Sequence, residues 1–299
     1  MNSLKSTLDR FYREYDFRAR LGHDPIEIPH RYKNPRDVEI TAFITCSLAY
    51  GRVELFKPVV EKLLSEMGAH PYEFLLEFRL KKQGRLFRGI KYRFNENEDL
   101  IALLFILHKI VRRHTSLEKL FMKSYRPGSL TIEEGLAGFT ASLLEINTSQ
   151  IYGKEMKPAG LKQLFPSPVN GSACKRANLF LRWMVRGRDI DFGIWKEIPA
   201  NRLIIPLDTH IARISRCLGF SRRTSQDWKM AVEITESLRR IDPEDPLKYD
   251  FALCHHGISG ICKGRKASAE CKGCVFRSRL PYTKNAFSES QEIYRFGKS

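Results

Sequence analysis

The chain has 299 residues, 42% of them hydrophobic, so it is long enough to bury one large core or two smaller ones. Its 51 lysines and arginines against 34 aspartates and glutamates give a net charge of +17. This excess favours a polyanionic partner such as DNA, RNA or an anionic membrane surface, with plain solubility as the alternative. The N-terminal stretch is charged and amphipathic, unlike a signal peptide, and no stretch approaches the roughly 18 apolar residues of a membrane span. We therefore expect a cytoplasmic protein that does not span a membrane.

Apolar residues recur at intervals of three and four along most of the chain, which is the period of an α-helix. Val59, Val60, Leu63 and Leu64, for example, fall on one side of a predicted helix. Alternating strand patterns are nearly absent, and the nearest one, RLIIPL, contains a proline. The sequence therefore predicts an all-α protein. The strongest predicted helices cover residues 3–21, 37–49, 53–67, 97–115, 116–123, 131–146, 174–186, 209–218, 225–241 and 246–255.

The chain also contains a long segment, 153–171, that is rich in proline and glycine. Such segments separate periodic elements and often mark linkers. We expect residues 1–299 to form a single two-lobed region with the linker between the lobes near 153–171, and with a cysteine loop at 254–279. We expect this region to be a monomer.

Asp208 lies in the stretch IIPLDTHIARISRCLG, between an apolar run and an amphipathic helix that starts at Thr209. An aspartate in this position is a good helix N-cap, worth roughly 0.5–2 kcal/mol. A carboxylate fixed there can also stabilise the positive charge of a sugar ring that is losing its base. Both interpretations of Asp208 remain open from the sequence.

Lys175 lies in the stretch GSACKRANLFLRWMV, at the predicted start of a helix. A helix N-terminus carries partial positive charge and therefore disfavours a cation. A lysine that works as a neutral amine can attack the C1′ atom of a sugar and form a Schiff base. The alternative is that Lys175 binds a phosphate at the helix start.

These two stretches resemble the motifs of the helix-hairpin-helix DNA glycosylase superfamily. Leu207, Asp208, Thr209, His210, Ile211 and Arg213 match its apolar-Asp-Thr-His-apolar-x-Arg hallmark. The segment from Gly171 through Lys175 and Ala177 resembles its hairpin, except that Ala173 replaces the second glycine and Val169-Asn170 replaces Leu-Pro. The resemblance implies that Asp208 is the catalytic carboxylate and that Lys175 is the nucleophile.

The resemblance also indicates a substrate. Asp208 lies 33 residues beyond Lys175, an interval similar to that of the archaeal 8-oxoguanine glycosylase branch. The stretches DVEITAFITCSLAYGRV and IDFGIWKEIPANRLIIPLDTH resemble a bacterial branch known chiefly as a domain of unknown function. We expect a base-excision repair glycosylase and AP lyase that acts on an oxidised purine such as 8-oxoguanine in double-stranded DNA. The alternatives are a monofunctional glycosylase that uses Asp208 only, a non-catalytic DNA-binding protein on the same scaffold, and an RNA-directed protein.

Several residues are candidates for contact with DNA or with a flipped base. Trp183 and Trp195 could stack on an extrahelical base, although aromatic residues at helical spacing are more often part of a core. Tyr50 or Arg52 could enter the duplex, with a helix C-cap at Gly51 as the alternative explanation of that loop. From the matched motifs we also expect contacts from Gly171, Arg176 and His210.

Four cysteines cluster near the C-terminus in the order Cys254-x7-Cys262-x8-Cys271-x2-Cys274. In a reducing compartment such a cluster indicates a metal site rather than disulfides. Cys262, Cys271 and Cys274 resemble three ligands of the 4Fe–4S cluster of endonuclease III-like glycosylases, and Cys254 replaces the missing fourth. Zinc is an alternative, with His255 or His256 as a further ligand, and a loop without metal is another.

Overall fold

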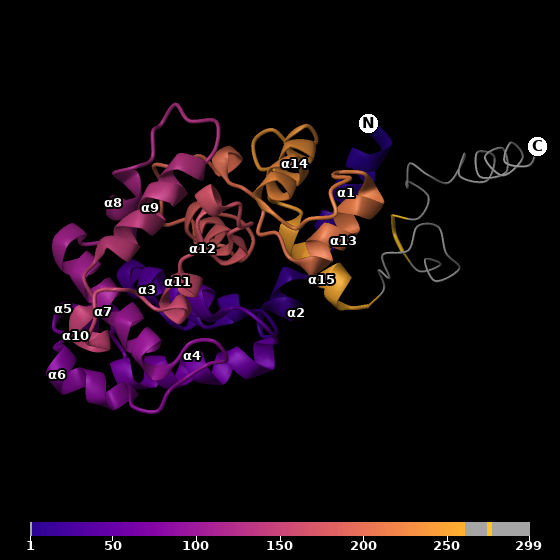
Figure 1. The fold of residues 1–299 in the computed structure, drawn as a ribbon. Helices are drawn as coiled ribbons and strands as arrows, with labels where there is room; N and C mark the ends of the chain where they lie inside the picture. Colours follow the sequence, from indigo (N-terminus) through magenta and orange to yellow (C-terminus); the bar gives the residue numbers. More distant parts are fainter. Residues whose placement is uncertain (1, 261–273, 277–299) are drawn as a thin grey trace, which may run out of the picture. The chain divides into compact units, whose positions relative to one another are not determined.

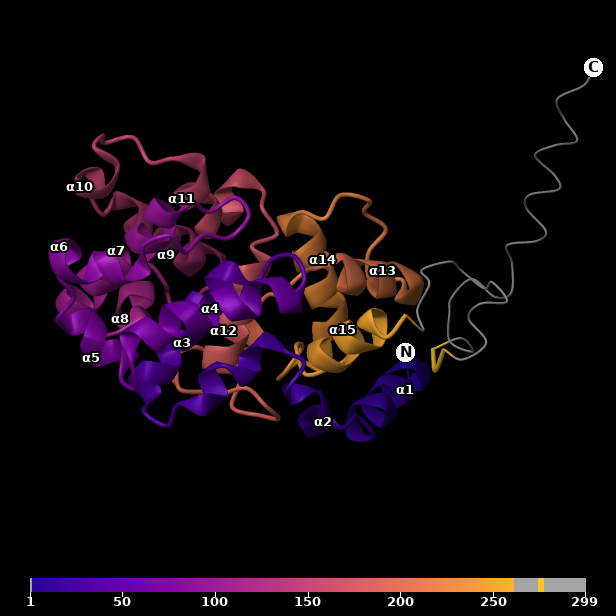
Figure 2. The ribbon, with the colours of Figure 1, turned by 90° about the horizontal axis from the view of Figure 1, so that it is seen from below.

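The computed structural model describes residues 2–260 and 274–276, and this part of the chain is all-α, as predicted (Figures 1 and 2). Within it there is no strand, and the nearest feature is an isolated antiparallel bridge between Tyr92 and Asn95. None of the helices described is long and apolar enough to cross a bilayer. The α-helices are α1 (Asn2–Arg13), α2 (Phe17–Leu21), α3 (Pro35–Leu48), α4 (Val53–Met67), α5 (Pro71–Leu76), α6 (Leu80–Gln83), α7 (Asn97–His114), α8 (Leu117–Met122), α9 (Glu133–Glu145), α10 (Ser149–Tyr152), α11 (Ala159–Leu164), α12 (Lys175–Val185), α13 (Thr209–Leu218), α14 (Trp228–Arg239) and α15 (Asp250–Ile258). Short 3-10 helices are η1 (Pro25–Glu27), η2 (Pro29–Arg31), η3 (Gly84–Phe87), η4 (Pro168–Asn170) and η5 (Ala200–Arg202).

The chain forms two compact units. The large unit is Phe17–Pro206, and the small unit combines Met1–Asp16 with Leu207–Ser299. The boundary after Pro206 differs from the predicted linker at 153–171, which lies inside the large unit and carries α11 and η4. The physical reason is that Leu161 and Leu164 of α11 are buried, and α11 packs against α7. A segment that buries apolar side chains in this way cannot act as a linker.

The small unit joins the N-terminal helix α1 to the helices at the other end of the chain. The Tyr249 hydroxyl donates to Asp9 of α1 at 2.6 Å, and the Lys248 ammonium lies 2.9 Å from the same carboxylate. The Phe11 ring packs edge-on against His256, with 5.5 Å between the centroids. Within the same unit, α13 packs against α15. These contacts explain why α1 does not belong with the helices that follow it in sequence.

Helix α3 is the centre of the large unit, because every residue from Asp37 to Leu48 is buried. A helix that is buried on all sides lies inside the core, where polar side chains need partners. Its two carboxylates therefore need buried partners, and they find them at the starts of other helices. Asp37 accepts a hydrogen bond from the Tyr72 amide of α5 at 2.8 Å. Glu39 in the same way accepts from the first amides of α8.

Glu39 joins three segments of the large unit. Its carboxylate accepts from the amides of Leu117 and Glu118, at 2.9 and 3.1 Å, and from the Trp195 indole nitrogen at 2.8 Å. Burial raises the pKa of this carboxyl to about 7, in spite of these three donors. The folded chain therefore binds a proton at Glu39 at pH values where the unfolded chain has released it.

This difference predicts a pH-dependent stability. As the pH rises from about 4.5 to about 7, the unfolded chain binds fewer protons at Glu39 than the folded chain, so the free energy of unfolding should fall and then level off. Glu39→Gln removes this titration and also loses one acceptor. The stability of the wild type relative to Glu39→Gln should thus decline by on the order of 2 kcal/mol over this range. Urea unfolding of both proteins at several pH values measures the decline, and a constant difference would contradict it.

Candidate functional site

Asp208 is the N-cap of α13, as its sequence position predicts. Its Oδ1 atom accepts from the amides of His210 and Ile211, at 2.9 and 2.8 Å, and its backbone is extended. Its Oδ2 atom accepts from the Cys254 thiol of α15 at 3.4 Å. The half-buried carboxylate is therefore fixed in orientation at the positive end of a helix dipole. An anion held in this way can face positive charge that develops on a bound molecule.

The first turn of α13 packs closely on α15. A Cβ atom added to Gly257 would lie 2.7 Å from the His210 Cβ atom, so only glycine allows this approach. The Arg213 guanidinium donates to the Gly257 carbonyl at 2.7 Å and lies 3.3 Å from the His210 Nδ1 atom. His210, predicted to contact DNA, is thus half-buried between Arg213 and α15, where it supports the helix that Asp208 caps.

Lys175 is the first residue of α12 and is half-buried. The residue before it, Cys174, has left-handed backbone (φ 48°) and provides no side-chain cap. Its thiol faces the carbonyls of Pro166 and Ser172 instead, at 3.5 and 3.3 Å. Helix α12 therefore begins without an N-cap side chain, and its first amide N–H groups offer a place for an anion such as phosphate.

The turn before α12 forms without the glycine that the resembled motif has at position 173. Positive φ angles occur at Gly171 (73°) and Cys174 but not at Ala173. The Asn178 side chain donates to the Ala173 carbonyl at 3.1 Å, which joins the turn to the first turn of α12. Alanine at 173 therefore introduces no left-handed strain, and Gly171 lies exposed at the surface of the turn.

Arg176 makes contacts inside the protein. Its guanidinium donates to the carbonyls of Ser47, in the last turn of α3, and Gln163, near the end of α11. It also lies over the Tyr50 ring, 5.1 Å from the centroid. Burial lowers its pKa to about 10, so it remains charged at neutral pH. Arg176 thus joins three segments of the large unit, and its contact with DNA stays a prediction.

The two predicted base-stacking tryptophans are core residues in this structure. Trp183 is 0% exposed and Trp195 is 1% exposed, so neither ring offers a face to a base. The Trp195 indole nitrogen is engaged by Glu39, and its ring packs edge-on against Phe180 with 5.3 Å between centroids. The prediction that these two tryptophans stack on a base is therefore wrong. Trp195 lies inside because the buried Glu39 carboxylate needs a hydrogen-bond donor.

The segment that follows α12 is held by a buried ion-pair network. Arg182 lies 3.2 Å from the Asp191 carboxylate, and Arg186 pairs with Asp191 and, at 3.0 Å, with Asp189. Both arginine side chains are 3% exposed. Because breaking a buried pair leaves an uncompensated charge, this network fixes the segment that leads toward Trp195.

The two candidates for entering a duplex, Tyr50 and Arg52, differ in how firmly their side chains are held. The Tyr50 hydroxyl donates to the Tyr92 carbonyl at 2.9 Å and to the Asn95 side chain at 2.6 Å, so its ring is held in place. The Arg52 side chain is 81% exposed and forms an ion pair with exposed Glu54, at 3.4 Å. Such a surface pair holds a side chain weakly.

Sequence reasoning missed Phe94, which is 67% exposed next to Tyr50. Their ring centroids are 6.3 Å apart, and the ring planes are tilted by only 16°. Phe94 belongs to a short turn between Tyr92 and Asn95 and not to a periodic helix. The sequence signal that could have found Phe94 is its surroundings: it lies in a polar stretch, outside every apolar repeat, where an aromatic side chain is expected at the surface.

The cysteine cluster is described in part. Cys262 and Cys271 lie outside the described residues, and among the described ones no group of three or more suitable side chains could hold a metal ion. The Cys254 thiol contacts Asp208, as noted above. The Cys274 sulfur lies 3.9 Å from the His256 Nε2 atom, and Phe276 packs on Phe11 and His256.

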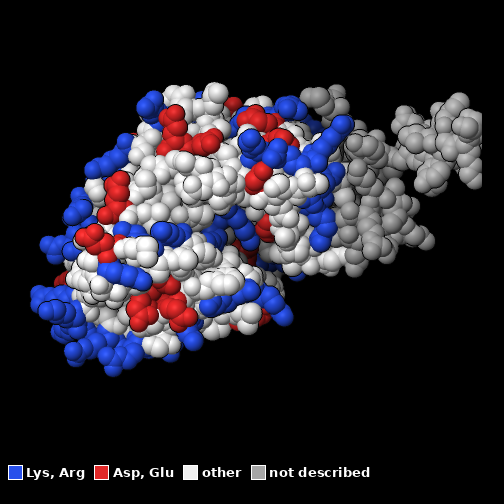
Figure 3. Space-filling view, viewed as in Figure 1, with Lys and Arg blue, Asp and Glu red and all other residues white. Residues whose placement is uncertain are grey.

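Positive charge on the large unit gathers over α6 and η3 (Figure 3). The exposed cations there are Arg79, Lys81, Lys82, Arg85 and Arg88. Lysine in α6 and arginine in η3 face solvent without ion pairs among the described residues. This patch is suited to long-range attraction of a polyanion.

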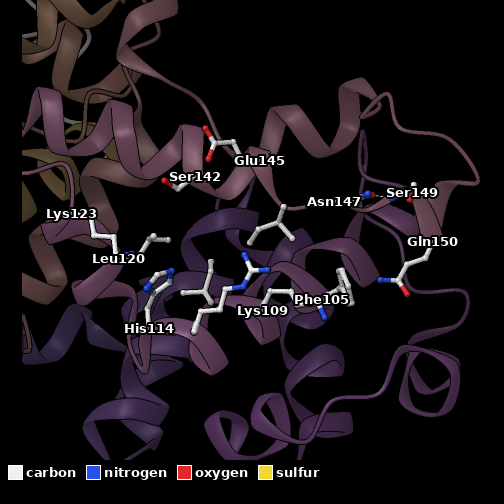
Figure 4. A pocket seen from close by; sticks show the side chains of 13 residues that line it. Phe105, Lys109, His114, Leu120, Lys123, Ser142, Glu145, Asn147, Ser149 and Gln150 are labelled. Carbon is white, nitrogen blue, oxygen red and sulfur yellow. Dashed lines mark hydrogen bonds between the residues drawn. The ribbon is translucent and has the colours of Figure 1, made fainter.

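A cavity of about 670 Å³ lies among α7, α8, α9 and α10 in the large unit. Figure 4 shows Lys123 and His114 toward one end and Gln150 toward the other. Arg113 occupies the last turn of α7, where a cation offsets the negative end of the helix dipole. Burial, together with Lys123 and Arg113, lowers the pKa of His114, which favours its neutral form. The fold thus accounts for Arg113 and His114 without a ligand.

The predicted residues fall in both units. The large unit holds Tyr50, Arg52, Gly171, Lys175, Arg176 and both tryptophans, whereas the small unit holds Asp208, His210 and the cysteines. In the large unit, Tyr50 and Arg176 are in contact, and Lys175 adjoins Arg176 in the first turn of α12. In the small unit, Asp208 and Cys254 are in contact.

Comparison with known protein families gives a match over most of the chain. Residues 24–259 match the model of the family described as "Protein of unknown function (DUF2400)". The matched region includes both Lys175 and Asp208. No match was found among curated proteins or among solved structures.

The capping geometry of Asp208 predicts the cost of replacing it. Asp208→Ala should lower the free energy of unfolding by about 1 kcal/mol, whereas Asp208→Asn should cost less than about 0.5 kcal/mol, because asparagine caps a helix as well as aspartate does. Asp227 caps α14 through the Met230 amide at 2.9 Å and provides a matched control, so Asp227→Ala should cost a similar amount. Urea unfolding of the full chain measures these values. Equal losses for alanine and asparagine at 208 would contradict the capping role.

Proposed function

The chain belongs to the DUF2400 family, and we propose that it is a DNA glycosylase of the helix-hairpin-helix kind. The observation that carries this proposal is the Asp208 carboxylate, held by two amides at the start of α13 within the motif Leu207-Asp-Thr-His-Ile-Ala-Arg. A carboxylate in this position suits a sugar that becomes positively charged as its base departs. Its substrate is double-stranded DNA with an oxidised purine, 8-oxoguanine first.

In the proposed reaction, Lys175 is the nucleophile and Asp208 is the electrostatic stabiliser. The neutral Lys175 amine attacks C1′, the N-glycosidic bond breaks, and the base leaves with the bonding electrons and takes up a proton. The nitrogen then loses a proton and forms a double bond to C1′ as the C1′–O4′ bond opens and O4′ takes up a proton, which gives the Schiff base. Loss of a proton from C2′ then breaks the 3′ C–O bond by β-elimination, with the 3′-phosphate as the leaving group. Asp208 faces the sugar while positive charge is greatest, which lowers the barrier to base loss.

The charge of the protein supports DNA as the partner. The net charge of +17 and the exposed cations over α6 and η3 favour a polyanion. The start of α12, which has no N-cap side chain, suits a backbone phosphate next to Lys175. Phosphate contacts of this kind position a duplex without reading its sequence.

We also propose that the cysteine loop binds a metal ion or cluster through Cys262, Cys271 and Cys274. The fourth donor distinguishes the two candidates: Cys254 would complete a 4Fe–4S cluster, and His256 would complete a Cys3His zinc site. The contacts of the described residues favour His256, because Cys254 directs its proton to Asp208 while Cys274 lies next to the His256 ring. A bound metal would tie this loop to α15.

A borohydride trapping experiment tests the proposed reaction. On a duplex with one 8-oxoguanine, the wild-type chain should form a covalent adduct when borohydride is added, because borohydride reduces the Schiff base. Lys175→Gln should form none. Asp208→Asn should slow base release by at least about 100-fold, since it removes the charge but keeps the helix cap.

Two variants serve as controls for this experiment. Lys162→Gln changes an exposed lysine in α11, and Asp227→Asn changes a helix cap in the small unit; both should react like the wild type. Base release without an adduct would show a monofunctional enzyme that uses Asp208 only. Retained DNA binding without release from any of a panel of lesions would instead support a non-catalytic DNA-binding protein.

The metal proposal has its own measurement. The purified full chain should contain zinc or iron by elemental analysis, and a brown colour with visible absorbance would identify an iron–sulfur cluster. Cys274→Ser and His256→Ala should lose the metal, whereas Cys254→Ser and Cys217→Ser should keep it. Loss of metal in Cys254→Ser together with visible absorbance in the wild type would contradict the His256 assignment.

A further inference from the structure

Four planar side chains of the large unit lie in a row that we call the cation–aromatic stack: Arg176, Tyr50, Phe94 and Arg93. The Arg176 guanidinium lies 5.1 Å from the Tyr50 centroid, and the Tyr50 and Phe94 centroids are 6.3 Å apart. The Arg93 guanidinium lies 5.7 Å from the Phe94 centroid. Cations within about 6 Å of an aromatic ring are attracted by its π-electrons. The stack thus runs from a half-buried arginine, through two aromatic rings, to an exposed arginine.

The inner part of the stack is held by hydrogen bonds. The Tyr50 hydroxyl donates to the Tyr92 carbonyl and to Asn95, and the Tyr92 hydroxyl donates back to the Tyr50 carbonyl. The Asn95 side chain donates to the Gly160 carbonyl of α11 at 2.7 Å. The loop after α3, the turn at 92–95 and the start of α11 are therefore joined into one support for Phe94.

Two glycines show how closely these segments pack. A Cβ atom at Gly51 would lie 2.9 Å from the Tyr92 hydroxyl oxygen, and one at Gly160 would lie 2.8 Å from the Phe94 carbonyl oxygen. Arg93 itself has left-handed backbone (φ 49°), a conformation that is strained in a non-glycine residue. The turn keeps this strained conformation, and its result is to present Phe94 to solvent.

The outer end of the stack has the chemistry of a nucleobase-binding surface. The Phe94 side chain is 67% exposed, although its backbone is fixed, so little conformational entropy would be lost on binding. Arg93 lies over this ring, and Arg52 follows Tyr50 by two residues; both are exposed cations that can contact phosphates. An aromatic face next to cations is the combination with which proteins bind unpaired bases.

We propose that Phe94 stacks on an unpaired base of a DNA duplex, and that the exposed Arg93 guanidinium leaves the Phe94 ring to contact a neighbouring phosphate, together with Arg52. This inference rests on the proposed function, because base removal requires that one base leave its pair and its partner base be supported. The inner end of the stack is Arg176, which directly follows Lys175. The stack therefore connects the base contact to the first turn of α12.

The test uses fluorescence anisotropy with two labelled duplexes of the same sequence, one intact and one with a central tetrahydrofuran abasic-site analogue that leaves a single unpaired base. The wild-type chain should bind the second duplex more tightly. Phe94→Ala should weaken that binding by about tenfold, the loss expected for one base–aromatic stack. It should change binding to the intact duplex by less than about twofold, because phosphate contacts dominate there.

The controls separate the base contact from general effects. Phe94→Trp keeps an aromatic face and should restore the wild-type preference. Leu130→Ala removes an equally exposed apolar side chain (79% exposed) of the same unit and should have no effect on either duplex. Thermal midpoints of all variants should agree, since Phe94 is on the surface.

The outcomes distinguish this inference from the proposed function. If the wild type binds the abasic duplex and is trapped by borohydride but Phe94→Ala binds equally well, the base-stacking role is wrong and the proposed function stands. If the wild type binds neither duplex, both are wrong. If Phe94→Ala weakens binding only to a single-stranded RNA of the same sequence, the stack binds RNA and the DNA inference is wrong.

Discussion

The arrangement of the candidate site in the large unit depends on the two hydrogen bonds that the Arg176 guanidinium donates to other helices. This arginine stands in the first turn of α12, where the helix dipole disfavours a cation, yet it donates to carbonyls near the ends of α3 and α11. The last carbonyls of a helix have no intrahelical donor and carry partial negative charge. One cation therefore satisfies two helix C-termini, and this offsets its unfavourable place at the start of α12. Because Lys175 directly precedes Arg176, these hydrogen bonds also hold the backbone from which the Lys175 side chain extends.

Asp208 shows that a structural role and a chemical role can belong to one side chain. Its Oδ1 atom caps α13, and its Oδ2 atom accepts a hydrogen bond from the Cys254 thiol, which is a weak donor. The cap fixes where the carboxylate points before any substrate arrives. Because preorganised charges lose nothing in reorientation during a reaction, the cap contributes to the proposed chemistry and does not compete with it.

The sequence predicted the long helices well and the short ones poorly. The predicted ranges 53–67 and 209–218 agree with α4 and α13 at both ends, because each contains several turns of apolar repeat. Helices α5, α6, α10 and α11 have four to six residues, which is too short for a period to emerge. The division into two units could not be predicted from local sequence patterns either, because α1 is held by Tyr249 and Lys248, which lie near the other end of the chain.

The candidate site was predictable where a residue's role follows from its place on a helix, and not where it follows from a distant partner. The N-cap of α13 needs only Asp208 and the helix after it. The tryptophans could be stacking or core residues by spacing alone, and Glu39, far away in sequence, decides the matter for Trp195: a buried carboxylate requires donors, and an indole N–H is one. Phe94 has no polar atom, so no hydrogen-bond partner determines where it lies. Its exposure follows from a turn that is fixed by Tyr50 and Asn95, and the surface it forms could be recognised only once those segments were seen together.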